Sequence, residues 1–184
     1  MLYGRKVWLG AAILALVLTV TPRAAADPQT FMYLWSEPGD YIGGGQTYYR
    51  DLSNGNFSTP NAFDQDGDGL ADYVQFFWQG NQLGQFVILQ FGTNQLPGTD
   101  LAPGNYFHAR RAPFAPAGHA GVDVSMDGRG CNTLRGELTI YNAVFDYSTG
   151  RPQVVSFAAY FRQHCEGAHP ALHGVFFYNY DPGS

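Results

Sequence analysis

The stretch that decides the fold is residues 134–164, which read LRGELTIYNAVFDY STGRP QVVSFAAYFRQH. Apolar residues alternate with polar ones in the first and last segments, and a period of two is typical of a strand with one buried face. The apolar residues of shared parity are Leu134, Leu138, Ile140 and Val144, and then Val155, Phe157, Ala159 and Phe161. The Ser, Gly and Pro between the segments are turn residues. We therefore expect 134–147 and 153–164 to pair as an antiparallel hairpin.

The rest of the chain continues the same pattern. No stretch carries apolar residues at helical spacing over three turns, and Gly or Pro interrupts nearly every window of a dozen residues. Further strand candidates are 46–51, 72–79, 85–92, 105–110, 122–126 and 173–180. About eight antiparallel strands separated by Gly, Pro and Asn turns predict an all-β fold, either a β-sandwich or a jelly roll, with a β-barrel as the alternative.

The chain has two cysteines, Cys131 and Cys165, which flank this hairpin. The outer ends of antiparallel neighbours lie side by side, so the hairpin and a Cys131–Cys165 disulfide support each other. The bridge would close a loop of about 35 residues, which the chain-entropy model values at roughly 3.5–4 kcal/mol. We expect a single disulfide, as is usual in exported proteins.

The N-terminus carries the features of a secretory signal peptide. Arg5 and Lys6 precede an apolar run over 7–20, and three alanines at 24–26 form an A-x-A cleavage site. The run is shorter than the ~20 apolar residues of a membrane-spanning helix, and nothing comparable follows it. We predict a signal peptide over 1–26, a single β domain over 27–184, and a secreted or periplasmic location without a membrane span.

Charge and composition argue against two classes of protein, nucleic-acid-binding proteins and disordered chains. The predicted mature chain has no lysine and seven arginines against 15 acidic residues, a formal charge of −8. This sign opposes binding to a phosphate backbone, so we expect no nucleic-acid partner. The 14 Phe and most of the 12 Tyr lie in the predicted mature chain, and that aromatic content is typical of a packed core rather than a disordered chain.

The acidic loop at 64–72, which reads DQDGDGLAD, is the most specific chemical signal. Its acids occupy positions 1, 3, 5 and 9 of a calcium loop, and Gly69 stands at position 6, where the chain turns sharply. The predicted calcium ligands are the side chains of Asp64, Asp66, Asp68 and Asp72 and the backbone carbonyl of Leu70. Gln75 replaces the bidentate Glu of an EF-hand, and the flanks have strand character. The loop therefore resembles the calcium hairpins of FG-GAP propeller blades and thrombospondin type-3 repeats; a solvated acidic turn is the alternative.

Signatures of catalysis are scarce. The segment around Cys165 also holds His164, His169 and His173, but the spacing fits neither a zinc site nor a thiol nucleophile, and Pro170 would break a helix there. There is no nucleophile elbow and no phosphate-binding loop. A pair of carboxylates could still act on a glycosidic bond. We expect a non-catalytic domain, with a secreted hydrolase acting on polysaccharide as the alternative.

Two strand candidates carry aromatic residues on both parities. If Val74, Phe76 and Trp78 face the core, Tyr73 and Phe77 face outward. The same reasoning, with Val175 and Phe177 inward, places Phe176, Tyr178 and Tyr180 outside. Exposed aromatic rings suit stacking on carbohydrate or contact with a protein partner at the cell surface. These five residues form the predicted ligand face; a second layer of core is the alternative.

Four segments carry a family resemblance: SEPGDYIG at 36–43, GRGCN at 128–132, QHCEG at 163–167 and PALHG at 170–174. They resemble a group of small exported bacterial all-β domains of unassigned function. The similarity extends over about 34–178 and includes both cysteines. The resemblance implies an exported, disulfide-bonded β domain. Together with the acidic loop, it leads us to expect an exported, calcium-stabilised β-sandwich that acts as a binding or surface-associated module.

Overall fold

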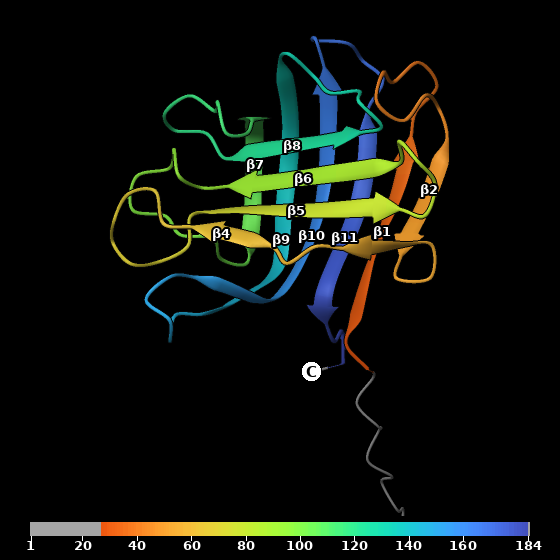
Figure 1. The fold of residues 1–184 in the computed structure, drawn as a ribbon. Coiled ribbons are helices and arrows are strands. Elements are labelled where there is room, and N and C mark those ends of the chain that lie inside the picture. Colours follow the sequence, from red (N-terminus) through yellow and green to blue (C-terminus); the bar gives the residue numbers. More distant parts are fainter. Residues whose placement is uncertain (1–26, 184) are drawn as a thin grey trace, which may run out of the picture.

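The computed structural model describes residues 27–183, which form eleven strands and no helix (Figure 1). The predicted signal peptide, 1–26, lies outside the described residues. The strands are β1 (Gln29–Ser36), β2 (Thr47–Asp51), β3 (Gly55–Phe57), β4 (Asn61–Phe63), β5 (Tyr73–Gly80), β6 (Phe86–Gly92), β7 (Gly104–Arg111), β8 (Gly121–Met126), β9 (Leu134–Asp146), β10 (Gln153–Cys165) and β11 (Leu172–Tyr180). Over this range there is no helix that is long and apolar enough to cross a membrane.

All eleven strands belong to one sheet, with the order β2-β1-β11-β10-β9-β7-β8-β6-β5-β3 and with β4 also paired to β5. The sheet folds over on itself, so that β5, β6 and β8 cross in front of β9, β10 and β11 (Figure 1). Strands β2 and β3 stand at opposite ends of the order, yet a three-residue turn joins them, so the sheet nearly closes into a barrel. The all-β prediction is confirmed. The strands number eleven rather than about eight, and β7 and β8 pair in parallel.

The core lies between the two layers. On β5 the residues Val74, Phe76 and Trp78 are fully buried, as predicted. The ring of Phe76 packs against Phe157 of β10 and Phe176 of β11, with centroids 5.3 and 4.6 Å away. Aromatic contacts of this kind bury large apolar areas and add a geometric preference. Aromatic side chains from both layers therefore meet at the centre of the core.

The predicted hairpin is confirmed as β9 and β10, which pair from Gln153↔Asp146 at the turn to Cys165↔Leu134 at the open end. Beside that open end the disulfide joins Cys131 to Cys165, whose Cα atoms are 5.0 Å apart and whose side chains are buried. The predicted disulfide is therefore confirmed.

Candidate functional site

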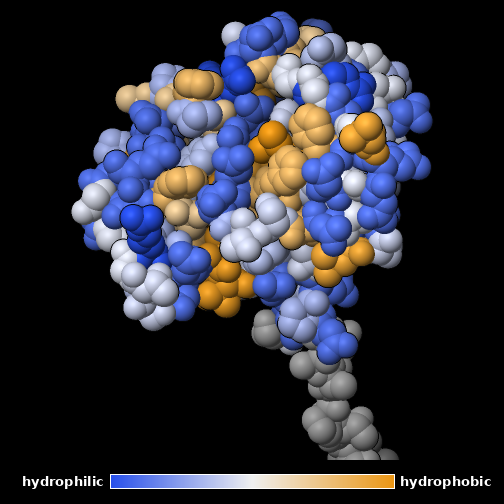
Figure 2. Space-filling model, in the orientation of Figure 1, coloured by the Kyte–Doolittle hydropathy of each residue, from blue (hydrophilic) through white to orange (hydrophobic). Residues whose placement is uncertain are grey.

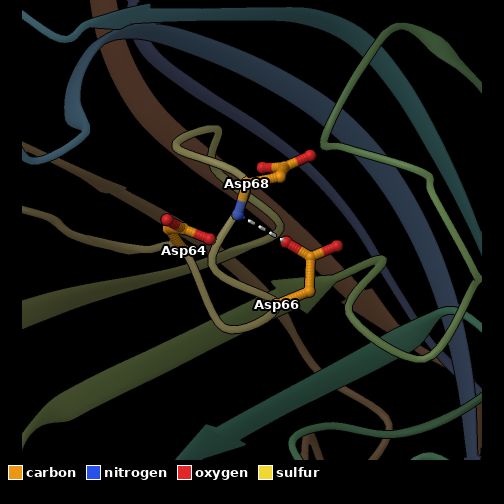
Figure 3. A group of neighbouring side chains, drawn as sticks. All are labelled: Asp64, Asp66 and Asp68. Atoms are coloured by element: carbon orange, nitrogen blue, oxygen red, sulfur yellow. Dashed lines mark hydrogen bonds between the residues drawn. The ribbon is translucent and has the colours of Figure 1, made fainter.

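The acidic loop connects β4 to β5 and gathers three carboxylates. Asp64, Asp66 and Asp68 each offer one carboxylate oxygen, and these atoms lie within 4.8 Å of one another (Figure 3). In residues 27–183 this is the one group of three or more His, Cys, Asp or Glu side chains placed closely enough to share an ion. The arrangement can hold a metal ion, and all of its side-chain donors are oxygen.

Backbone amides hold this loop in shape. The carboxylate of Asp64 accepts hydrogen bonds from the amides of Gly67, at 2.7 Å, and Gly69, at 2.9 Å. Both glycines have positive φ angles, +83° and +94°, which residues with a side chain adopt only at a cost. The amide of Asp68 donates to Asp66 Oδ1 at 3.3 Å, which is the dashed line in Figure 3. Gly67 and Gly69 therefore allow the backbone conformation in which both of their amides reach Asp64.

The other two predicted ligands belong to the same loop but differ in role. Asp72 is buried, and both of its carboxylate oxygens accept a hydrogen bond from the amide of Gln65 at 3.1 Å. Burial raises the pKa of Asp72, and the charges of Asp66 and Asp64 raise it further. Its carboxylate is not one of the three grouped oxygens. The amide of Leu70 donates to Asp68 Oδ1 at 2.8 Å, so Leu70 is fixed to the loop through its backbone.

A further acid, from another part of the chain, lies near enough to the loop to interact with its charges. Asp100 follows β6, and burial raises its pKa, with additional contributions from the negative charges of the Asp64, Asp66 and Asp68 side chains. Its position is set by the amide of Leu101, which donates to the carbonyl of Ala71 at 2.8 Å. No local pattern links Asp100 to the loop, so sequence reasoning missed it. The added charge makes the loop more attractive to a cation.

The predicted ligand face is in part wrong. Phe176 is fully buried in the core and Tyr178 packs against it, so the inward parity of β11 is opposite to the one expected. Tyr73 is 4% exposed because β4, which was not predicted, pairs with β5 and places Phe63 5.8 Å from its ring. Buried rings cannot form a docking surface.

The remaining two predicted residues lie nearer the surface. Phe77 faces outward on β5 and is half-buried, since its ring stacks on Phe86 at 6.2 Å. Figure 2 shows the face that carries β5, β6 and β8, where apolar patches alternate with hydrophilic side chains. Tyr180 packs against Phe177 at 4.9 Å, on the outer side of β11. The predicted residues therefore do not form one continuous face.

Aromatic residues, some exposed and some half-buried, do gather on the opposite layer, on the outer face of β2, β1, β11 and β10. Trp35 lies parallel to the ring of His173, 5.1 Å away, and 6.1 Å from Tyr160. Tyr33, which is 42% exposed, lies 5.7 Å from Trp35. We call Tyr33, Trp35 and Tyr160 the aromatic platform. The sequence shows the period of β1 only weakly, because aromatic residues occupy its outward positions as well.

The chain matches no protein-family model, no curated protein and no solved structure.

Proposed function

We propose that the chain is an exported, non-catalytic β domain that binds one calcium ion in its 64–72 loop and serves as a binding or surface-associated module. The observation that carries the metal proposal is the group of three carboxylate oxygens within 4.8 Å on a loop shaped by two glycines of positive φ. Three carboxylates this close repel one another, and a bound divalent cation removes that repulsion.

Calcium fits the donor set better than other common ions do. Zinc prefers nitrogen and sulfur ligands, whereas this group offers only oxygen. Magnesium demands near-ideal octahedral geometry and keeps several waters, while calcium accepts irregular oxygen cages of six to eight ligands. Backbone carbonyls and the nearby acids, Asp72 and Asp100, are within the same part of the fold to complete such a cage.

A structural role follows from what the loop touches. The side-chain amide of Asn94, which follows β6, donates to Gln65 Oε1 at 2.9 Å, and the amide of Ala71 donates to the hydroxyl of Tyr147 at 3.3 Å. An ion in the loop would therefore brace three separate chain segments. Export is supported by the N-terminal signal features and by the buried disulfide, which is typical of oxidising compartments.

The test is the thermal stability of the purified domain with and without calcium. An ion that binds only the folded state adds about 2.7 kcal/mol at a hundredfold excess over its Kd, which corresponds to a rise in Tm of roughly 5–10 °C. Chelation should reverse the rise, and magnesium should produce a smaller one. Asp66→Asn and Asp68→Asn should each abolish the calcium response.

The matched control is Asp27→Asn, which removes the same charge from an exposed site outside the loop. This variant should keep the full calcium response. A wild-type Tm that changes with neither calcium nor chelator would refute the calcium site. So would an equal loss of response in Asp27→Asn, because the effect would then depend on net charge alone.

A further inference from the structure

A cavity of about 400 Å³ opens on the outer face of β7, β9 and β10. Three arginines and three histidines line it: Arg110, Arg135, Arg162, His108, His164 and His169. The chain as a whole is acidic, with a formal charge of −5, and only seven arginines occur in the described residues. Three of these seven therefore converge on a single cavity, against the overall charge of the molecule.

The register of the sheet places like charges next to one another. Arg110 of β7 lies directly opposite Arg135 of β9, and Arg135 lies opposite His164 of β10. The Arg110–Arg135 pair places two positive charges opposite each other, which destabilises a sheet. The acid that lines the cavity, Glu137, bonds Arg162 Nη2 through Oε1 at 2.7 Å and lies opposite Arg162 in the register. One carboxylate among three guanidinium groups leaves the cavity with an excess of positive charge.

Hydrogen bonds within the protein orient the three arginine side chains but leave some of their N–H groups without a partner among the described residues. Arg110 Nη1 donates to the carbonyls of His108 and Ala109, and Arg135 Nη2 donates to the carbonyl of Gly167 at 3.2 Å. Arg162 Nε is buried and has no hydrogen-bond partner in the part of the chain that the structure describes. A buried donor without a partner is costly. Since a guanidinium carries five donors, an oxyanion in the cavity could accept several hydrogen bonds.

The edge of the cavity at β7 is built by an irregular backbone. The pairing of β7 with β9 shifts register between Tyr106 and Ala109, and within this bulge His108 has a φ of +58°. The His108 carbonyl is held by Arg110 and by His119 Nδ1, at 2.9 Å. Bulges and residues of positive φ often re-aim side chains beside binding sites. This bulge precedes Arg110, which faces the cavity.

The aromatic platform lies beyond the cavity on the same outer face, and His173, whose ring stacks on Trp35, lies between Trp35 and Arg162. Arg162 lies opposite His173 of β11, and His173 lies opposite Trp35 of β1, so the three residues form one row across the outer face of the sheet. Adjacent strands are about 4.8 Å apart, which puts the Trp35 strand about 10 Å from Arg162. This is the span of a ligand of one or two sugar rings whose charged group occupies the cavity.

We infer that the cavity binds an oxyanion, carboxylate or sulfate, carried by an acidic glycan, whose neighbouring sugar ring packs across the outer edges of the stacked His173 and Trp35 rings. This inference deepens the proposed binding function, on which it rests, by naming the ligand class. It does not depend on the calcium loop. The bidentate geometry of a guanidinium matches a planar carboxylate or one edge of a sulfate, and the outer edges of stacked rings offer an apolar surface to a pyranose.

The test is calorimetric titration of the whole protein, at fixed calcium, with three probes. These are a tetrasaccharide of glucuronic acid and N-acetylglucosamine, its uncharged methyl ester, and a sulfated counterpart. The acidic or sulfated tetrasaccharide should bind and the ester should not; the comparison of the two charged probes identifies the preferred oxyanion. Arg135→Gln and Arg162→Gln should each weaken binding about tenfold or more, because a charge-assisted hydrogen bond is lost.

Three further variants sharpen the test. Arg151→Gln removes the same charge from an exposed turn outside the cavity and should leave affinity unchanged. Glu137→Gln should tighten binding, since it removes the competing carboxylate from Arg162. Trp35→Ala should weaken binding of the tetrasaccharide more than that of inorganic sulfate.

Several results would overturn the inference. These are no binding of either charged probe, equal binding of the methyl ester, or an equal loss of affinity in Arg151→Gln. If a single-stranded oligonucleotide bound more tightly than either glycan, the ligand class would be a nucleic acid and the glycan inference would be wrong. The Asp66→Asn variant, which lacks the calcium response, should retain glycan binding, so the two proposals can fail independently.

Discussion

Asp123 on β8 shows what a buried charge does to this fold. Its side chain is buried, with Oδ2 2.9 Å from Arg111 Nε and with Oδ1 unpaired among the described residues. Burial raises the pKa of Asp123, and the hydrogen bond and charge of Arg111 only partly oppose this. The nearby charge also helps to raise the pKa of Tyr73, although burial is the larger cause there. Ionisation of Asp123 is therefore less favourable in the folded protein than in the unfolded chain.

The pH dependence of stability should reveal this residue. The folded protein keeps the Asp123 proton above the ordinary aspartate pKa of 3.8, where the unfolded chain has already lost it. The contribution of Asp123 is thus fully present below that value and is lost as pH rises towards the raised pKa. A tenfold difference in proton affinity between the folded and unfolded states corresponds to about 1.4 kcal/mol. Asp123→Asn removes this titration. Urea unfolding of both proteins from pH 4 to 7 gives the unfolding free energy of the wild type minus that of Asp123→Asn. This difference should fall as pH rises.

The comparison with Asp123→Asn is needed because other acids change the unfolding free energy with pH in the opposite direction. Hydrogen bonds lower the pKa of Glu37, mainly from His173, and of Asp51, mainly from Ser53. Their stabilisation is lost as pH falls, so the raw pH profile mixes both signs. Asp27→Asn removes one exposed carboxylate from outside the core and is the control for the change in net charge. A constant difference between wild type and Asp123→Asn across the range would contradict the prediction.

Single residues could be predicted where the chemistry is local. The three grouped aspartates and two glycines of the loop lie within six residues, so their spacing alone indicates how they meet. Asp100 interacts with the charges of the same loop but lies about 30 residues away in the sequence, and Arg110 and Arg162 line one cavity only because of the order of the strands. Groups assembled by tertiary pairing leave no local pattern, so the basic cavity was not predicted.

At the scale of elements, β11 shows why the predicted parity was wrong. Four consecutive residues, 175–178, are all apolar or aromatic, so alternation does not identify the buried set. The structure resolves the choice at Gly174, where a side chain would collide with the ring of Phe161. Gly174 therefore faces the core, and Phe176 shares its parity. The signal was present in the sequence as a glycine within a strand, which often marks close approach of a neighbour.

The β9–β10 hairpin and its disulfide form the second element of interest. Replacing both Cys131 and Cys165 by Ala should lower the free energy of unfolding by about 3.5–4 kcal/mol, because the unfolded chain regains the entropy of a loop spanning 34 positions. That is a large part of a total of about 5–15 kcal/mol. Urea unfolding measures the loss. Reduced wild-type protein is the control and should match the double variant; a loss below about 1 kcal/mol would show that the bridge adds little to folding.

At the scale of the whole molecule, the sequence predicted the all-β class but neither the full number of strands nor their order in the sheet. Alternation in β9 and β10 reflects local burial, which the sequence records directly. The parallel pairing of β7 with β8, and the near closure through β2 and β3, depend on contacts between distant segments. Gln163 is one such contact: its buried side-chain amide bonds the backbone N–H and C=O of Val124, at 2.9 and 2.7 Å, and ties β10 to β8. In the sequence, Gln163 is a single polar residue among inward-facing apolar ones, and nothing near it indicates that Val124 is its partner.

The same architecture separates the calcium loop from the disulfide. The loop contacts Tyr147 at the turn end of the β9–β10 hairpin, whereas the bridge lies at the open end, beside Leu134. The thirteen residues of β9 span roughly 40 Å at 3.3–3.4 Å per residue. Perturbations at sites this far apart, with no shared partners, usually add to within about 0.3–0.5 kcal/mol.

Chelation and loss of the disulfide should therefore destabilise the domain independently. Urea unfolding of wild type and of the Cys131→Ala, Cys165→Ala double variant, each with calcium and with chelator, gives the four free energies of a cycle. The loss on chelation should be the same in both proteins within about 0.5 kcal/mol. A larger coupling would mean that the hairpin transmits strain along its whole length, so that the loop and the bridge stabilise one cooperative unit rather than two ends of the sheet.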